Sequence, residues 1–214
     1  MTLVLLIRHG HTPTAGRVLT GWTRGVHLSE RGRAQAEALV HRLEGVPLQA
    51  IYSSPLERCR ETAAPLARAR GLPVRTRRDL LEVNYGEWTG RSIRQLARTR
   101  AWRALQRTPS AVRFPGGETL SEVQARAVDA VRDIAEAHPG GVVAIVTHAD
   151  VVRLALAGLL GLPLDLSQRL AVDPGSVSVV AIADAEVRAL RVNDTGDLGE
   201  LVPARRRSRR RAAG

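Results

Sequence analysis

Residues 3–12 read LVLLIRHGHT: five apolar residues in a row, then an arginine, a histidine and a glycine. A run that is apolar throughout, rather than alternating, is typical of a strand covered on both faces of its sheet. Packing alone does not need a cation and an imidazole at the end of such a strand. We therefore expect residues 2–7 to form a buried strand, and Arg8, His9 and Gly10 to belong to a site at its carboxyl end.

The size and charge of the chain favour a single domain. Its 214 residues can bury a full hydrophobic core. The formal net charge is +11, and because the chain holds no lysine, all 32 of its cations are arginines. Six of them lie in residues 205–214, which leaves +5 for the rest. The single cysteine excludes an internal disulfide. No window approaches the roughly 20 apolar residues that span a bilayer, so we expect a cytoplasmic protein without a membrane span.

Apolar spacing and capping signals place helices between the strands. Residues 29–43 repeat their apolar positions at helical spacing. Ser54 is expected to cap the next helix, with Pro55 at its first position, Glu57 completing the capping box and Gly71 ending it. The other expected elements are helices over about 92–106, 120–137 (capped by Thr119 with Glu122) and 151–160, and strands over 140–147, 176–183 and 186–192. This alternation predicts an α/β fold, a three-layer α/β/α sandwich with a mostly parallel central sheet.

Polar residues from distant segments are expected to meet at one edge of that sheet. His9 follows the first strand, and His148 follows a late strand. Arg58 lies in the first turn of the helix that follows a second, short strand, which begins near Ala50. Guanidinium groups suit phosphate because their planar fork donates two hydrogen bonds. Arg8 and the first turn at Pro55 would strengthen anion binding there. Gly10 would let the backbone approach a ligand closely.

This arrangement predicts nucleophilic attack on phosphorus by an imidazole. The histidine must be neutral, and neighbouring arginines help by lowering its pKa. The departing alcohol needs a proton donor, and Glu82, in the segment LLEVNYGEW, is the best-placed carboxylate.

Six segments in order carry a family resemblance: RHG, TGWTRGVHLSERG, SSPLERCRETA, LLEVNYGEWTG, PGGETLSEVQAR and VTHADVVR. Together they resemble the histidine phosphatase superfamily, the phosphoglycerate-mutase-like proteins, over about residues 3–183. The resemblance implies that His9 is the nucleophile, that Arg8, Arg58 and His148 hold the phosphoryl oxygens, and that Glu82 is the general acid. It also implies that Thr20 and Gly21 contact phosphate or substrate, and that neither a metal nor another cofactor is used.

The chain departs from the family pattern at three positions. His11 stands where glutamate or glutamine is frequent, and Ala15 stands where asparagine is frequent, so a phosphate contact is missing or replaced. Ala149 stands where glycine is usual, which would narrow the space beside His148. We expect His11 to line the rim of the pocket or to influence the choice of substrate.

The short stretch of sequence between Glu82 and Glu118 favours a phosphatase over a mutase. Phosphoglycerate mutases carry a longer insertion that shields the phosphohistidine from water, whereas 36 positions separate Glu82 from Glu118 here, with no lysine between them. The alternative is mutase-type phosphoryl transfer. His9 and His11 also resemble a metal-binding pair, but Arg8 beside a dication would be repulsive. Cys59 could be a reactive thiol, although packing is the usual role of a cysteine on a helix, and we assign it none.

We expect residues 1–202 to form the catalytic domain, with a small cap or specificity insertion at about 84–117. Residues 203–214 form an arginine-rich tail that we expect to be disordered. The expected partner is a small phosphorylated molecule. A function from another class, weak binding of nucleic acid or an anionic surface, would rest on the tail alone. The oligomeric state is open, with a homodimer among the options.

Overall fold

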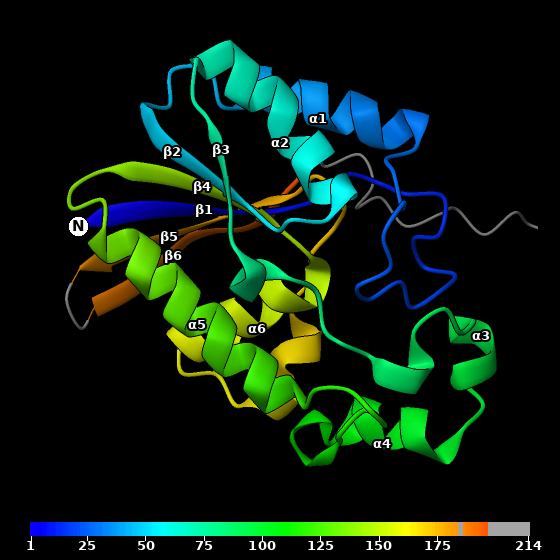
Figure 1. Cartoon of the computed structure of the whole chain (residues 1–214). Coiled ribbons are helices and arrows are strands. Elements are labelled where there is room, and N and C mark those ends of the chain that lie inside the picture. Colours follow the sequence, from blue (N-terminus) through cyan, green and yellow to red (C-terminus); the bar gives the residue numbers. More distant parts are fainter. Residues whose placement is uncertain (184–185, 197–214) are drawn as a thin grey trace, which may run out of the picture.

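The computed structural model describes residues 1–183 and 186–196, and within them a six-stranded mixed sheet forms the centre of the molecule (Figure 1). The strands are β1 (Thr2–Arg8), β2 (Leu48–Ser53), β3 (Val74–Thr76), β4 (Val142–Thr147), β5 (Val177–Ala183) and β6 (Glu186–Asp194). Their order is β3-β2-β4-β1-β5-β6. The first four are parallel to one another, β5 is antiparallel to β1, and β6 is antiparallel to β5. The predicted mostly parallel sheet is confirmed.

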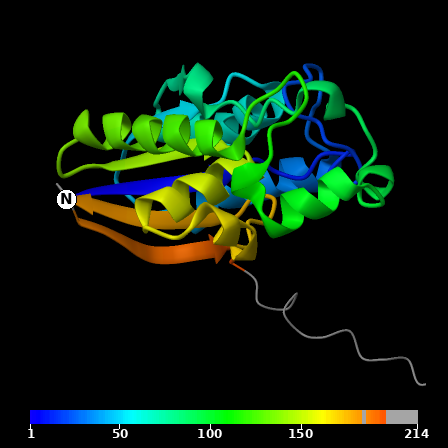
Figure 2. The ribbon, with the colours of Figure 1, turned by 90° about the horizontal axis from the view of Figure 1, so that it is seen from below.

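Helices cover both faces of the sheet. On one face lie α1 (Glu30–Arg42) and α2 (Glu57–Arg70), and on the other lie α5 (Leu120–Glu136) and α6 (Ala149–Leu159) (Figures 1 and 2). Alternate residues of β1 face the two layers: Val4 and Leu6 belong to the core with α5 and α6, and Leu5 and Ile7 to the core with α1 and α2. This explains why the strand is apolar throughout, and the predicted sandwich is confirmed.

Most of the predicted helix ends are confirmed. The Ser29 side chain accepts a hydrogen bond from the Gly32 amide at the start of α1. Thr119 and Glu122 form the expected capping box on α5, and Gly71 ends α2 in the left-handed conformation, with φ of 62°.

The predicted cap of α2 is wrong. The helix begins at Glu57, Leu56 occupies the N-cap position, and no side chain caps it. The Ser54 hydroxyl lies 2.9 Å from His148 Nε2 and accepts only a long hydrogen bond of 3.4 Å from the Leu56 amide. A local capping signal was therefore overridden by a partner that lies 94 residues away in the sequence.

The predicted helix over 92–106 is two short helices, α3 (Ile93–Leu96) and α4 (Arg100–Arg107). Thr99 separates them, because its side chain accepts a hydrogen bond from the Trp102 amide and so starts a new helix. Further short 3₁₀ helices lie at Arg78–Leu80, Gly86–Trp88, Pro109–Ala111 and Leu164–Arg169.

The segment 84–117 lies at the end of the molecule opposite the N-terminus (Figure 1). Its apolar residues join the core of α5 and α6, with the Trp88 ring 5.4 Å from that of Phe114 and 6.2 Å from that of Trp102.

In the described part of the chain, no helix has the length and apolar character needed to cross a membrane. The predicted tail, residues 203–214, lies outside the described residues.

Candidate active site

Strand register brings two histidines together. Arg8 at the end of β1 pairs with Thr147 at the end of β4, and the His9 amide donates to the Thr147 carbonyl at 2.9 Å. His9 and His148 therefore leave two neighbouring parallel strands at the same level. Their ring centroids lie 5.3 Å apart, with the planes inclined at 70°.

The His9 ring is held in one orientation by the backbone. Its Nδ1 atom lies 2.7 Å from the Gly10 carbonyl oxygen. Because a carbonyl only accepts, Nδ1 carries the proton and Nε2 keeps its lone pair. Burial, followed by the positive charge of Arg58, lowers the pKa of His9 to about 3. The imidazole is thus neutral at physiological pH, with Nε2 available for attack.

His148 lies behind His9, fully buried. Its Nε2 atom contacts the Ser54 hydroxyl at 2.9 Å and Cys59 Sγ at 3.5 Å. Burial, followed by the charge of Arg58, keeps its pKa well below the usual value. Burial also raises the pKa of the Cys59 thiol, so Cys59 packs as a neutral group in this part of the site. The structure brings His148 to His9 but does not include it in the wall of the cavity described below.

Two guanidinium groups flank His9. Arg58 is 2% exposed, and its Nη2 donates to the Gly21 carbonyl at 2.7 Å. Arg8 donates from Nη1 to the Val172 carbonyl at 2.6 Å, while its buried Nε has no hydrogen-bond partner within the described residues. A buried donor without a partner carries a free-energy cost that a bound anion would relieve. The pair thus fits a phosphoryl group, which offers several acceptor oxygens.

Glu82 is a buried carboxyl group at the same cavity. It is 8% exposed, Oε1 accepts from the Val83 amide at 3.1 Å, and Oε2 lies 4.0 Å from His148 Nδ1. Burial, followed by the negative charge of Asp150, raises its pKa to about 7 against the opposing charge of Arg58. A carboxyl group with that pKa holds a proton at neutral pH often enough to act as a general acid.

Arg126 fixes the segment that carries Glu82. From α5 its guanidinium donates to three carbonyl oxygens, those of Asp79 at 2.8 Å, Leu81 at 2.7 Å and Glu82 at 2.9 Å. It also pairs with Glu118, with N–O distances of 2.8 and 3.0 Å. Sequence reasoning placed Arg126 and Glu118 in a family motif but assigned them no role, because nothing local shows which carbonyls a distant arginine will meet.

The loop after β1 supports the site less directly than expected. A Cβ at position 10 would lie 2.5 Å from the Gly32 carbonyl oxygen, so Gly10 permits close approach to α1 rather than to a ligand. His11 turns to the start of α1, where its Nδ1 contacts the Ser29 hydroxyl at 2.8 Å, and it does not line the cavity. The expectation for His11 at the rim is therefore wrong. Thr20 and Gly21 do line the cavity.

These groups share a cavity of about 240 Å³. Its wall holds the predicted residues Arg8, His9, Thr20, Gly21, Arg58 and Glu82. Sequence reasoning missed three polar wall residues that form a chain of contacts. Tyr85 donates from its hydroxyl to Asp150 Oδ2 at 2.7 Å, and Asp150 pairs with Arg153. The spacing of Asp150 and Arg153, three residues apart on the helix after His148, was the available signal.

Comparison with known proteins agrees with this geometry. A model of the histidine phosphatase superfamily (branch 1) matches residues 4–195. Phosphoserine phosphatase 1 of Hydrogenobacter thermophilus is 32% identical over 176 residues, which cover 81% of this chain and 83% of that protein. Among solved structures, Bacillus stearothermophilus YhfR superposes with a TM-score of 0.84 at 31% identity, covering 91% of this chain and 98% of that one. A mycobacterial glucosyl-3-phosphoglycerate phosphatase superposes with a TM-score of 0.81 at 26% identity, covering 90% and 98%.

Proposed function

The chain belongs to the histidine phosphatase superfamily, and from this we propose that it is a phosphatase that hydrolyses small phosphomonoesters through a phosphohistidine on His9, without a metal ion. We propose further that residues 1–202 form one catalytic domain with a cap at about 84–117, and that the enzyme acts in the cytoplasm.

One observation carries this proposal: a neutral His9 whose Nδ1 proton is bound by the Gly10 carbonyl, in a cavity wall shared with Arg8, Arg58 and Glu82. The backbone contact leaves Nε2 as the nucleophilic atom. The arginines supply positive charge for the phosphoryl oxygens, and the acid stands in the same wall. A histidine buried only for packing would not need two guanidinium groups beside it.

In the first step, substrate binds as a dianion against Arg8 and Arg58, with His148 behind the reacting ring. His9 Nε2 attacks phosphorus, and the bond from phosphorus to the ester oxygen breaks. Glu82 gives its proton to that oxygen, so the alcohol leaves neutral. The ring gains positive charge as the N–P bond forms, and the Gly10 carbonyl stabilises it through the Nδ1 proton.

In the second step, the oxygen of a water molecule attacks phosphorus while the Glu82 carboxylate takes a proton from that water. The N–P bond breaks, and its electron pair returns to Nε2. Inorganic phosphate leaves, and both His9 and Glu82 return to their starting protonation states.

Hydrolysis is favoured over transfer because water can reach the intermediate. The segment between Glu82 and Glu118 forms two short α-helices and two turns of 3₁₀ helix, and the His9 cavity opens to the surface. A mutase would have to keep water away from the phosphohistidine until a second hydroxyl group is phosphorylated.

The proposal is tested by phosphate release from sugar phosphates, phosphoglycerates and nucleotides in the presence of EDTA. We expect turnover in the chelator, its loss in His9→Ala, and full retention in His41→Ala, a control histidine exposed on α1. Activity that EDTA removes, or that survives in His9→Ala, would contradict the mechanism. Phosphoryl exchange within phosphoglycerate with little free phosphate would favour the mutase.

A further inference from the structure

The charges in the His9 cavity are already balanced by one phosphomonoester. Arg8, Arg58 and Arg153 are positive, Asp150 is negative and pairs with Arg153, and Glu82 is protonated when the reaction starts. The cavity therefore offers two uncompensated positive charges, which match the two negative charges of the phosphoryl group. A further anionic group on the leaving alcohol finds no match at this depth.

Part of the cavity wall is apolar. Ala15, Val18, Leu19 and Ile93 line it, and they come from the loop after β1 and from the segment 84–117, the expected specificity insertion. This part favours an uncharged, carbon-rich portion of the leaving group next to the ester oxygen.

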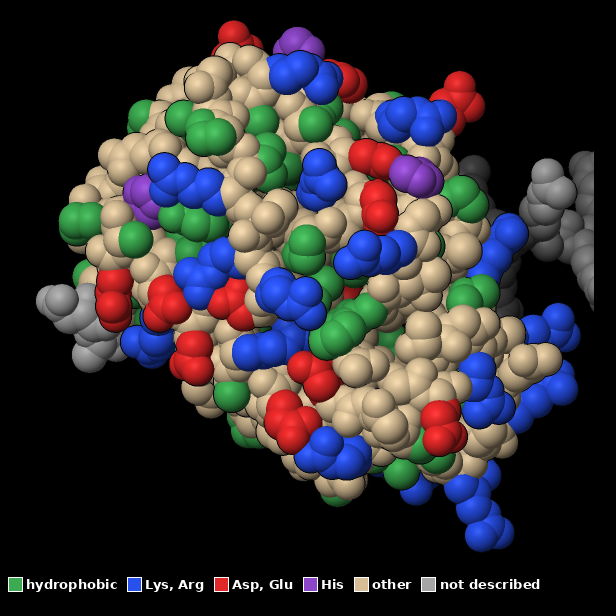
Figure 3. Space-filling model, in the orientation of Figure 1, with side chains coloured by type: hydrophobic (Ala, Val, Ile, Leu, Met, Phe, Trp, Pro, Cys, Tyr) green, Lys and Arg blue, Asp and Glu red, His purple; other side chains and the backbone are tan. Residues whose placement is uncertain are grey.

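The same two segments are strongly basic. Residues 11–26 hold Arg17 and Arg24 and no acidic residue, and residues 84–117 hold seven arginines and one glutamate. Figure 3 shows arginine side chains gathered at the end of the molecule around α3 and α4. Positive charge is thus concentrated in two segments that each contribute residues to the cavity wall.

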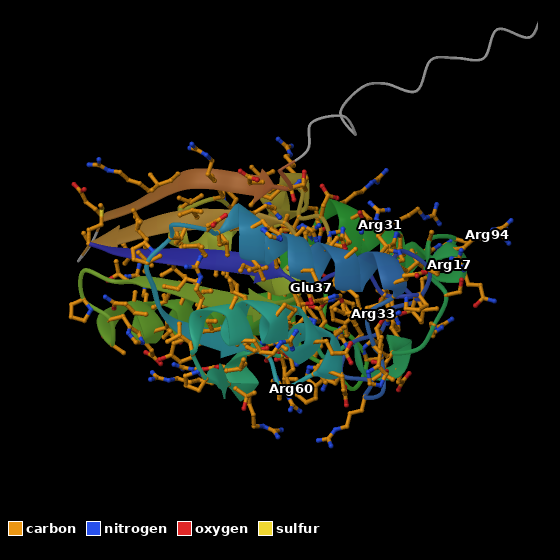
Figure 4. The ribbon with its side chains drawn as sticks, turned by 90° about the horizontal axis from the view of Figure 1, so that it is seen from above. Arg17, Arg31, Arg33, Glu37, Arg60 and Arg94 are labelled. Atoms are coloured by element: carbon orange, nitrogen blue, oxygen red, sulfur yellow. The ribbon has the colours of Figure 1, made fainter. Side chains whose placement is uncertain are left out.

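Arg17 and Arg94 occupy the junction of these segments. The Ile93 amide donates to the Arg17 carbonyl at 2.9 Å, and Val18 bridges Ser92, so each arginine is one residue from a wall residue, Val18 or Ile93. Figure 4 shows both arginines together at that end of the molecule. Both are exposed.

Within the described residues neither guanidinium has a partner, in contrast to several other exposed arginines. Arg68, Arg113 and Arg188 are exposed and pair with Glu37, Glu122 and Glu186. The side chains of Arg17 and Arg94 form no hydrogen bond or ion pair within residues 1–183 and 186–196. Their charge is therefore available to a ligand.

We propose that Arg17 and Arg94 form a second anion subsite at the mouth, and that the enzyme selects phosphomonoesters whose leaving group carries a distal negative charge beyond an uncharged stretch. This inference rests on the proposed phosphatase function. The distal group is a carboxylate or a second phosphate, since guanidinium binds both.

A matched pair of aryl phosphates tests the subsite. The substrate 4-carboxyphenyl phosphate carries the distal charge, and its methyl ester does not. The ester group withdraws electrons more strongly, so intrinsic reactivity favours the uncharged compound. We expect wild-type kcat/KM to favour the carboxylate by about tenfold at low salt, and this preference to shrink as salt is added, because the mouth is exposed. A third arm, 1,4-phenylene bisphosphate, shows whether phosphate serves better than carboxylate.

The variants separate the subsite from general surface charge. The double variant Arg17→Gln/Arg94→Gln should abolish the preference. Arg60→Gln removes a single arginine from α2, away from the cavity mouth (Figure 4), and should retain the preference for the carboxylate substrate. The double variant Arg60→Gln/Arg33→Gln loses the same charge as Arg17→Gln/Arg94→Gln and should also retain this preference.

Equal kcat/KM for the acid and the ester in the wild type, or a preference that survives in the mouth variant, would overturn the inference while leaving the phosphatase function intact. A different result would contradict the phosphatase function itself, namely that no aryl phosphate is hydrolysed faster by wild type than by His9→Ala. In that case the inference falls with it.

Discussion

Burial shifts the pKa values of His9 and Glu82, two side chains of the cavity wall, in opposite directions. The same loss of water that lowers the pKa of His9 to about 3 raises that of Glu82 to about 7, since each side chain is driven toward its neutral form. The site thereby holds a neutral nucleophile and a protonated acid at the same pH. Both states are needed in the first step that we propose.

The pH profile should report Glu82. Its carboxyl group must be protonated for the first step, so kcat/KM for an alkyl phosphate should fall as pH rises through about 7. Glu82→Gln should lose this basic limb, and its rate should fall by about 10²- to 10⁴-fold, more for alkyl than for nitrophenyl phosphate. Glu87→Gln, which changes an exposed acid in the same segment, is the control. A basic limb that persists in Glu82→Gln would assign the acid to another group.

His9 should make folding sensitive to acid. It is neutral in the folded protein, whereas the unfolded chain binds a proton there below about pH 6.5, so lowering the pH favours unfolding. Between pH 7 and pH 5 the free energy of unfolding of His9→Gln should therefore fall by about 2 kcal/mol less than that of the wild type. Urea unfolding at both pH values measures this, with His41→Gln as the control. Equal pH dependence in wild type and His9→Gln would mean that folded His9 takes up the proton.

Single residues could be predicted when their signal was local. His9, Arg58 and Glu82 were identified from motifs, and the structure gathers them at one cavity. The contacts of Gly10 and His11 could not be predicted, because they are made with α1, about twenty residues away. Arg153 was missed, although it lies in the segment VTHADVVR, because the contacts of a charged side chain depend on the direction in which its helix runs.

At the scale of elements, strands and caps were predicted correctly where no other group competed for the capping side chain or for the start of the helix. The strand over 2–7 and the capping box at Thr119 are confirmed because each depends on neighbouring residues. The capping box at Ser54 failed because the hydroxyl contacts His148, and the helix over 92–106 broke because Thr99 offered a second start. Tertiary contacts and competing caps account for both errors.

Arg126 belongs to this scale because it ties α5 to the segment of the acid. Arg126→Lys keeps the charge, but a lysine cannot reach three carbonyls and Glu118 together. The Glu82 side chain should therefore move from its position in the cavity wall. We expect turnover of alkyl phosphates to fall about tenfold to a hundredfold, with a smaller loss for nitrophenyl phosphate, which needs little proton donation. Arg132→Lys, on the same helix, is the control. An equal loss for both substrates would show a general structural role instead.

At the scale of the whole molecule, the cap and the sandwich share one core. Phe114 is 1% exposed and packs edge-to-face against Tyr85 and Trp88, within the same cluster as residues of β1, β4 and α5. The sequence marked 84–117 as an insertion but could not show that its aromatic residues are buried with the sheet. We infer that the cap has no independent stability.

Phe114→Ala tests this inference. The loss of a fully buried ring should lower the free energy of unfolding by about 3–5 kcal/mol, and hydrogen exchange in α3 and α4 should remain coupled to that in the sheet. Val112→Ala, at a half-buried position nearby, should cost less. Faster exchange confined to the cap, with an unchanged unfolding midpoint for the sheet, would show that the cap is a separate unit.

The central claim, a phosphoryl group carried on His9, is tested most directly by stopping a single turnover in alkali and locating the phosphoryl group by mass spectrometry. Cleavage after Arg8 and Arg17 releases a peptide that contains both His9 and His11, so fragmentation must distinguish them. We predict one phosphoryl group, on His9, that forms before free phosphate and disappears as phosphate is released. A phosphoryl group on His11 or on another residue, or phosphate formed with no such intermediate in Glu82→Gln, where its hydrolysis is slowed, would contradict the account.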